Sequence, residues 1–247
     1  MQQLSYPKPK YQALPNESQC PTCGYFDTNH PDVRRILLSR DHRGNRLRQA
    51  RCKCLLAAEN EKAKDDLRRQ QANLPHQTAP RRFDNWEHSE SNEGGFTACQ
   101  DFADGRLPFL VLCGPVDVGK SHLLEATGWH LLDHRRAVRY EYTPAFLDRL
   151  RACYDMDGEE NLADLLSWYR GRVLLLDDLG VEKPSEWVQE KLTSLVDERL
   201  RDGLRTVVAT NLSETETQKR LGERLASRLF GETRVVHLPR TGHRRQR

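Results

Sequence analysis

Eight residues near the middle of the chain have the composition and spacing of a phosphate-binding loop. Residues 114–121 read Gly-Pro-Val-Asp-Val-Gly-Lys-Ser and fit the pattern G-x-x-x-x-G-K-[ST]. The glycines let backbone N–H groups curve around phosphate oxygens, Lys120 can reach the β- and γ-phosphates, and the hydroxyl of Ser121 can ligate Mg²⁺. These residues therefore predict a binding site for a nucleotide and its magnesium ion.

A pair of carboxylates follows a second apolar run. The segment Val173–Leu176 leads directly into Asp177 and Asp178. A buried parallel strand delivers the side chains at its carboxyl end to the sheet edge where a Mg²⁺-nucleotide binds, so both aspartates are predicted to lie at that site. The predicted nucleotide-binding residues of the loop are Gly114, Pro115, Val116, Asp117, Val118, Gly119, Lys120 and Ser121, with Ser121 as a magnesium ligand.

The elements around these motifs alternate between strand and helix. Apolar runs predict strands over 107–113, 137–142, 173–176 and 206–210, and helical periodicity follows the loop, recurs in two segments of 144–170, and covers 185–202. Strands that alternate with helices form a parallel sheet covered on both faces. We therefore expect an α/β fold with a three-layer core.

Four of the seven cysteines lie in two close pairs near the N-terminus. Cys20 and Cys23 form a C-x-x-C pair, and Cys52 and Cys54 form a C-x-C pair that could bind from a strand or turn. Together they supply four thiolates for a tetrahedral structural Zn²⁺ site, which leaves no open position for a substrate. Free thiols are the alternative, and His30 or His42 could replace one ligand.

Length and composition set the organisation of the chain. With 247 residues, 37% hydrophobic and 30% charged, it can hold one α/β domain and a small accessory module. No apolar run approaches the ~18 residues of a membrane span, and the first residues lack the hydrophobic segment of a signal peptide. We expect a cytoplasmic protein without membrane contact. Residues 1–72 would form an N-terminal module with a linker helix over 55–72, and 73–247 the core with a basic tail.

Charge is distributed unevenly along the sequence. Residues 1–72 hold 14 Lys and Arg against 8 Asp and Glu, residues 73–218 hold 16 against 26, and residues 219–247 hold 9 against 2. Basic ends around an acidic body indicate contact with nucleic acid or with an acidic partner surface. Solvated charge without a partner is the alternative for the N-terminal run.

Six segments in unbroken order resemble the DnaC/IstB/DnaI group of AAA+ proteins over about residues 74–245. The segments are Phe83–Trp86, Gly114–Ser121, Val173–Gly180, Ser185–Trp187, Val207–Leu212 and Gly222–Leu229. The cysteine module followed by a helix is similar to the zinc-bearing N-terminal domains of some bacterial and phage helicase loaders. The resemblance implies an ATPase that uses ATP, ADP and Mg²⁺, binds DNA and a partner protein, and switches its assembly with its nucleotide state.

The resemblance also implies catalytic roles outside the loop. Asp177 takes the position of the cofactor-binding residue that supports Mg²⁺, and Asp178 that of the residue that polarises the attacking water. Asn211 takes the sensor position after the fourth strand. An asparagine that only turns the chain is the alternative there. Arg228 looks like the arginine finger offered to a neighbouring subunit, with Arg224 as the other candidate one turn away. Arg244 looks like the second sensor arginine.

Two residues depart from the family pattern. Asp117 occupies a position where this family usually has Gly, although translation-factor GTPases with a similar loop carry Asp there. Asp178 is shorter than the Glu common in other AAA+ enzymes, which places the attacking water differently and fits slow turnover. We therefore expect an ATPase that turns over slowly and acts as a timed switch, not as a motor. Rapid ATP hydrolysis by the isolated protein, without DNA or a partner, would contradict this.

Three functions remain open on the sequence. The first is a replicative helicase loader that grips the hexameric helicase through its N-terminal module, binds single-stranded DNA through its core and self-assembles through the arginine finger. The second is an IstB-type transposition-targeting ATPase acting on duplex DNA, and the third is a nucleotide-regulated adaptor that does not act on DNA. Any DNA contact is expected at backbone phosphates. Most aromatic residues, Tyr140 among them, are expected in the core and not stacked on bases.

Overall fold

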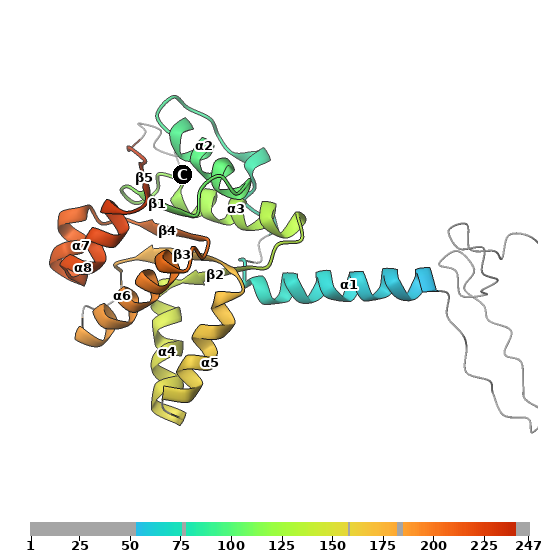
Figure 1. Ribbon diagram of the computed structural model, residues 1–247. Coiled ribbons are helices and arrows are strands. Elements are labelled where there is room, and N and C mark those ends of the chain that lie inside the picture. Colours follow the sequence, from blue (N-terminus) through green and yellow to red (C-terminus); the bar gives the residue numbers. More distant parts are fainter. Residues whose placement is uncertain (1–52, 76–77, 158, 182–184, 241–247) are drawn as a thin grey trace, which may run out of the picture. The chain divides into compact units, whose positions relative to one another are not determined.

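The computed structural model describes residues 53–75, 78–157, 159–181 and 185–240. Within these residues one parallel sheet has the strand order β2-β3-β4-β1-β5 (Figure 1). Its strands are β1 (Phe109–Cys113), β2 (Val138–Tyr142), β3 (Val173–Leu179), β4 (Thr206–Thr210) and β5 (Arg234–His237). All four neighbouring pairs run parallel, as the alternating sequence predicts.

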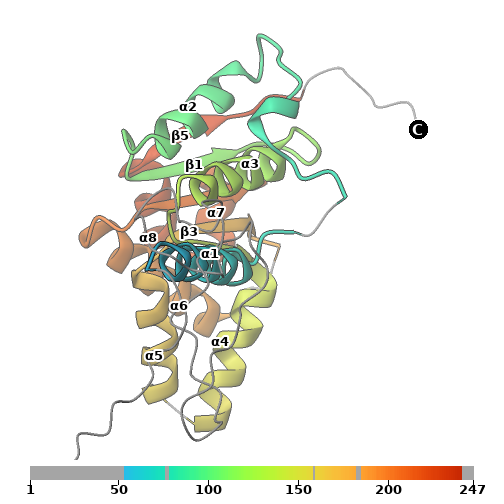
Figure 2. The same cartoon turned by 90° about the vertical axis from the view of Figure 1, so that its right-hand side faces the viewer.

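Helices cover both faces of the sheet (Figures 1 and 2). One face carries α2 (Glu93–Ala103) and α3 (Lys120–Asp133), and a short 3₁₀ turn, η2 (Phe83–Asn85), packs near them. The other face carries α4 (Thr143–Asp157), α5 (Glu159–Arg170), α6 (Glu186–Arg201), α7 (Glu214–Leu221), α8 (Glu223–Ala226) and the π-type turn η3 (Ser227–Gly231). The predicted three-layer α/β core is confirmed.

Alternating side chains of each strand build two separate cores. Leu110 and Leu112 of β1 pack with α2 and α3, whereas Phe109 and Val111 pack with the helices of the opposite face. This period of two is that of a strand buried on both faces, where almost every residue is apolar. β1 and the first four residues of β3 therefore read as continuous hydrophobic runs in the sequence, whereas β2 contains Arg139 and Glu141.

Local signals place the helix ends as expected. The hydroxyl of Ser185 accepts the N–H of Val188 at 3.2 Å and caps α6, and Gly203 follows its last turn with φ +63°. The two helices expected within 144–170 are α4 and α5. Two features differ from the expectation. β3 continues through both aspartates to Leu179 by way of a bulge, and β5 is an edge strand that the periodicity did not indicate.

The chain divides into two compact units, Met1–Asp66 and Leu67–Arg247. The division falls inside α1 (Lys53–Ala72), six residues before the boundary expected at 72 and 73. Cys20, Cys23 and Cys52 lie outside the described residues, as do His30 and His42. Cys54 belongs to the first turn of α1, a helix where a strand or turn was expected, and its side chain is not described. In the described part of the chain, no helix is long and apolar enough to cross a membrane.

Candidate nucleotide site

The predicted phosphate loop connects β1 to α3 at the side of the sheet where the parallel strands have their carboxyl ends. We call this side the carboxyl edge, and the side where the strands begin the amino edge. Its last glycine, Gly119, has φ +95°, and a Cβ atom there would lie 2.5 Å from the ring of Trp86. Only glycine combines this backbone conformation with such a close approach. Trp86 therefore closes over the loop from the segment before α2, which explains why Phe83–Trp86 accompanies the loop in the sequence.

Asp117 adopts a left-handed conformation at the exposed tip of the loop, with φ +64°. Glycine adopts this region without strain, and Asp and Asn tolerate it better than other residues. The geometry thus accounts for the usual glycine at this position and for the aspartate found here.

Lys120 is the first residue of α3, and its side chain turns back over the loop. Its ammonium group donates hydrogen bonds to the carbonyls of Gly114 at 2.8 Å and Pro115 at 2.6 Å. Burial lowers its pKa, and the nearby carboxylates of Asp178 and Asp177 oppose that shift. A lysine held in this position could reach phosphate oxygens, and Ser121 follows it in the first helical turn, where N–H groups lack partners within the helix.

Asp177 is almost fully buried, with 3% of its surface exposed, and both oxygens of its carboxylate are engaged. Oδ2 accepts the hydroxyl of Tyr140 at 2.5 Å, and Oδ1 accepts the backbone N–H of Asp178 at 3.0 Å. The hydroxyl of Thr143 also donates to the backbone carbonyl of Asp177 at 2.7 Å. The carboxylate therefore has a fixed orientation at the end of β3.

Asp178 lies in the bulge of β3 with φ +55°, a strained conformation for a residue other than glycine. Burial raises the pKa of its carboxyl group, the charge of Asp177 raises it further, and Lys120 opposes the shift. Bulges next to sites redirect a side chain out of the strand's alternation. Two consecutive aspartates can thus serve the same edge of the sheet.

Asn211 follows β4 at the same edge, and its Oδ1 is buried without a hydrogen-bond partner among the described residues. The turn out of the strand is stabilised by Thr210 instead. Its hydroxyl donates to Leu179 at 2.8 Å and accepts the N–H of Leu212 at 3.1 Å. A buried acceptor without a donor is costly unless water or a ligand completes it. This observation favours the sensor interpretation over a turn-making asparagine.

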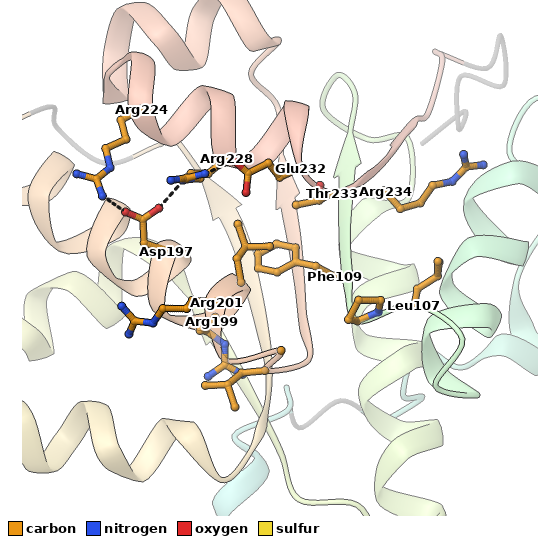
Figure 3. Close-up of a pocket in the computed structure, with 14 residues that line it drawn as sticks. Leu107, Phe109, Asp197, Arg199, Arg201, Arg224, Arg228, Glu232, Thr233 and Arg234 are labelled. Carbon is orange, nitrogen blue, oxygen red and sulfur yellow. Dashed lines mark hydrogen bonds and ion pairs between the residues drawn. The ribbon is translucent and has the colours of Figure 1, made fainter.

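The two candidate finger arginines lie at the opposite edge of the sheet (Figure 3). The carboxylate of Asp197 on α6 accepts hydrogen bonds from Arg228, at 2.7 Å, and from Arg224. Arg224, Arg228 and Asp197 line a cavity of about 620 Å³. Phe109 and Arg234, the first residues of β1 and β5, also line it. Five residues of a parallel strand span about 13 Å, so neither arginine shares the phosphate loop's edge.

The structure thus separates the predicted site residues into three groups. Lys120, Ser121, Asp177, Asp178 and Asn211 lie together at the carboxyl edge. Arg224 and Arg228 share Asp197 at the amino edge, and the structure does not choose between them. Arg244 lies outside the described residues.

Sequence reasoning missed two buried groups beside the site. Tyr140 bonds to Asp177, although the sequence suggested only a core aromatic. Glu125, one turn after Ser121 on α3, is 1% exposed, pairs with Arg81 at 2.8 Å and has a pKa raised by burial. A polar residue amid the apolar positions of a helix was the available signal for Glu125. For Tyr140, the contact depends on the pairing of β2 with β3.

Comparisons with known proteins agree with this arrangement. Residues 79–234 match the family model of the bacterial DnaA ATPase domain. The chromosomal replication initiator protein DnaA of Leptospira biflexa is 34% identical over 114 residues, which cover 42% of this chain and 26% of the initiator. The replicative helicase loader DnaC of Escherichia coli K12 is 27% identical over 128 residues, 51% of each protein. The chain thus spans a quarter to a half of the length of these relatives.

A solved structure extends the likeness to the fold. The crystal structure of the DnaC helicase loader matches with a TM-score of 0.56 and 23% sequence identity. The match covers 64% of this chain and 96% of that one. The sheet and its flanking helices therefore have the fold of that solved structure.

Proposed function

Because this chain belongs to the family of the bacterial DnaA ATPase domain, we propose that it binds ATP with Mg²⁺ at the carboxyl edge of its sheet and hydrolyses it to ADP. The observation that carries the proposal is that Lys120, Asp177 and Asp178 lie together at that edge. They are close enough that the charges of both aspartates raise the pKa of Lys120, against the lowering by burial. The oxygen donors fit the ion, since Mg²⁺ is bound by one or two carboxylates and by hydroxyl, water and phosphate oxygens.

Each residue has a distinct part in the proposed reaction. Lys120 and the first-turn N–H groups of α3 hold the phosphates, while Ser121 and Asp177 hold the metal, which when bound neutralises charge on the phosphate oxygens. Asp178 orients and polarises the attacking water. The unpartnered Oδ1 of Asn211 accepts a hydrogen bond from that water.

The arginine at the amino edge acts on a neighbouring copy. Arg228, or Arg224 in its place, is too far from its own loop to touch the same nucleotide, so it completes the site of the next subunit in an assembly. An arginine supplied by a neighbour makes hydrolysis depend on assembly. Slow turnover by the isolated chain and acceleration on assembly follow from this arrangement.

The replication function that we favour is that of a helicase loader. Two likenesses support it: the sequence match to the Escherichia coli loader spans half of each protein, and the fold match to a solved DnaC loader covers 96% of that chain. In this proposal the N-terminal module binds the replicative helicase, with Cys20, Cys23, Cys52 and Cys54 around a structural zinc ion. The core and its basic tail bind the phosphates of single-stranded DNA.

A pull-down from lysate of the native host, with and without ATP, tests the proposal. The zinc content of the same purified sample is measured alongside, and Lys120→Ala is the matched control without the phosphate ligand. Recovery of a replicative helicase by the wild-type chain in a nucleotide-dependent way, with one zinc per chain, is expected. Recovery of a transposase with filaments on duplex DNA would instead indicate the transposition class. A partner without any DNA binding would indicate an adaptor.

A further inference from the structure

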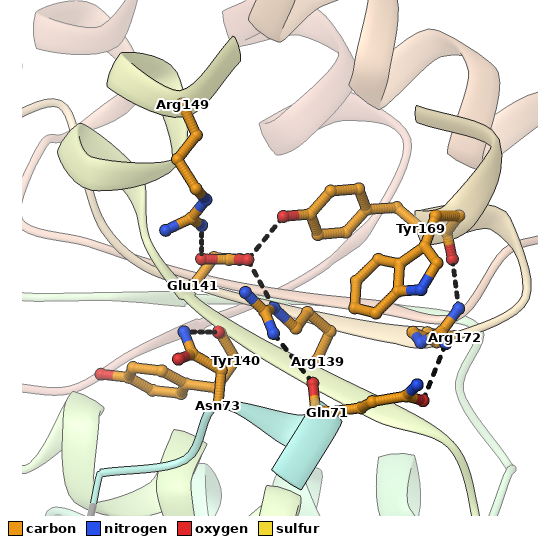
Figure 4. Close-up of polar contacts among 9 residues, drawn as sticks. Gln71, Asn73, Arg139, Tyr140, Glu141, Arg149, Tyr169 and Arg172 are labelled. Carbon is orange, nitrogen blue, oxygen red and sulfur yellow. Dashed lines mark hydrogen bonds and ion pairs between the residues drawn. The ribbon is translucent and has the colours of Figure 1, made fainter. Parts of the chain in front are cut away.

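A polar network joins the end of α1 to β2 (Figure 4), and Tyr140 of β2 donates a hydrogen bond to the carboxylate of Asp177. It runs through β2, whose residues alternate between the two faces of the sheet. Tyr140 faces the α3 side and belongs to the same core as Leu123, whereas Arg139 and Glu141 face the α4 and α5 side. Tyr140 therefore contacts the proposed nucleotide site on one face of the sheet, while its neighbours Arg139 and Glu141 make polar contacts on the other face.

Tyr140 touches the site directly. Its ring is buried, with 8% exposed, and its hydroxyl donates to Oδ2 of Asp177 at 2.5 Å. The N–H of Asp178 fixes the other oxygen, Oδ1, at 3.0 Å. Each carboxylate oxygen has two lone pairs, so both oxygens retain acceptor capacity for a cation while their orientation is set.

The backbone of β2 is fixed by the residues that end α1. The side-chain amide of Asn73 donates to the carbonyl of Tyr140 at 3.0 Å, and Arg139 donates to the carbonyl of Gln71 at 2.9 Å. Asn73 has φ +55°, which terminates the helix in a left-handed residue. In Figure 4, Asn73 lies beside Tyr140, and Arg139 reaches from Glu141 to Gln71. These two hydrogen bonds fix the end of α1 and the backbone of β2 relative to each other.

Glu141 anchors the opposite face of the same strand. Its carboxylate, 1% exposed, accepts hydrogen bonds from Arg139 at 2.6 Å, from the hydroxyl of Tyr169 at 2.5 Å and from Arg149. Arg172 stacks 3.6 Å from the centroid of the Trp168 ring and donates to the side chain of Gln71 at 3.0 Å. These contacts hold β2 on both faces and connect it to the end of α1.

We propose that Tyr140 is a positioning residue for the magnesium ligand Asp177, and that the end of α1 sets its position through Asn73. The inference rests on the proposed function, because it assigns a role to Tyr140 in the same site. It makes the linker that leads to the N-terminal module part of the nucleotide switch. Partner binding to that module would then alter magnesium and nucleotide affinity through β2.

The Mg²⁺ dependence of nucleotide binding tests the role of Tyr140. Binding of a fluorescent ATP analogue to Tyr140→Phe is titrated with Mg²⁺, and the half-saturating concentration is expected to rise about tenfold, as for other partners of metal-ligating side chains. Binding in EDTA should not change. Tyr169→Phe is the comparison variant: it removes an equally short tyrosine bond to Glu141, which supports β2 but does not touch Asp177, so its shift should be much smaller than that of Tyr140→Phe. Equal shifts in both variants, or none in Tyr140→Phe, would overturn the inference.

Asn73→Gly tests the link to the helix. Glycine keeps the left-handed backbone and removes only the bond to Tyr140. The half-saturating Mg²⁺ concentration is expected to rise about threefold, and the double variant with Tyr140→Phe should not exceed Tyr140→Phe alone, because the coupling passes through Tyr140. An unchanged Mg²⁺ dependence in Asn73→Gly, or additive shifts in the double variant, would overturn the link.

The outcomes separate this inference from the proposed function. A wild-type chain that bound no nucleotide with Mg²⁺ would overturn both. Wild-type binding with an unaltered Tyr140→Phe would overturn the positioning role alone. Thermal unfolding of each variant without nucleotide shows whether all four retain the fold, and their shifts in Mg²⁺ dependence are compared at a temperature where they do.

Discussion

The two edges of the sheet treat their charged residues in opposite ways. At the amino edge, Arg199 is 2% exposed and its guanidinium donates to the hydroxyl of Thr206 and to the carbonyls of Tyr169, Arg172 and Arg205, at 2.7 to 3.1 Å. At the carboxyl edge, Asp117 and Asp178 have left-handed backbones, and Asn211 has a buried oxygen without a partner among the described residues. The amino edge also has a left-handed residue, Arg135, and a buried nitrogen without a partner among the described residues, Nε of Arg205. What distinguishes the carboxyl edge is that its strained and unpartnered groups lie beside the phosphate loop, where a ligand could complete them.

The largest effect is expected from Arg228, because in the proposed assembly this arginine of the amino edge would complete the nucleotide site at the carboxyl edge of a neighbouring subunit. Arg228→Ala should lower assembly-dependent ATP turnover about 10³-fold at saturating ATP while nucleotide binding persists. Arg224→Ala is the matched control, since it shares Asp197 and should lose far less. Mixing Arg228→Ala with Lys120→Ala, each inactive alone, should restore turnover by pairing an intact loop with an intact arginine. The assignment reverses if Arg224→Ala shows the larger loss.

Removing the loop lysine should abolish function without harming the fold. Lys120→Ala is expected to lower kcat/KM for ATP by about 10² to 10³, as for other charged groups that stabilise a transition state. The unfolding temperature should hardly fall, because burial already disfavours the charge of this lysine and lowers its pKa. Turnover assays and thermal melts on one preparation check both statements. A large drop in stability would show that the carboxyl edge is structural as well.

Removing the buried arginine of the amino edge should do the reverse. Arg199→Met keeps much of the side-chain volume but leaves four acceptors without their donor, so the free energy of unfolding should fall by about 3 kcal/mol. Any folded fraction should bind nucleotide as the wild type does. Urea unfolding and nucleotide titration check the pair of outcomes. Normal stability with impaired binding would contradict the division between the edges.

The smallest effect is expected in the alkylation rates of two buried thiols. Cys113 ends β1 next to the phosphate loop, whereas Cys99 lies in α2, away from the charge of Lys120. Burial raises the pKa of Cys99, a residue of α2, to about 12, and it also raises the pKa of Cys113, where the charge of Lys120 opposes the shift. The thiolate is the reactive form, so at pH 8 both should alkylate slowly, and raising the pH to 10 should label Cys113 several-fold faster than Cys99. Mass spectrometry of the native protein measures this order. Equal rates would show that local opening, and not thiolate formation, limits both reactions.

Much of the core was predictable because its signals are local. The loop at 114–121, the apolar strands and the capped helix from Ser185 all depend on residues close together in the chain. β5 escaped prediction because it has only four residues, none of them fully buried, and gains its strand geometry from pairing with β1. The bulge at Asp178 escaped because it depends on register against β4.

By itself, the sequence determined the chemistry of this protein: a phosphate loop, two acidic residues after a strand, and an asparagine after the next. Tertiary structure decided which groups meet. It placed Tyr140 against Asp177, tied β2 to the end of α1, and put Arg224 and Arg228 on the edge opposite the phosphate loop. Propensity and spacing act over a few residues, whereas these contacts join residues 31 to 67 positions apart and exist only once the strands pair.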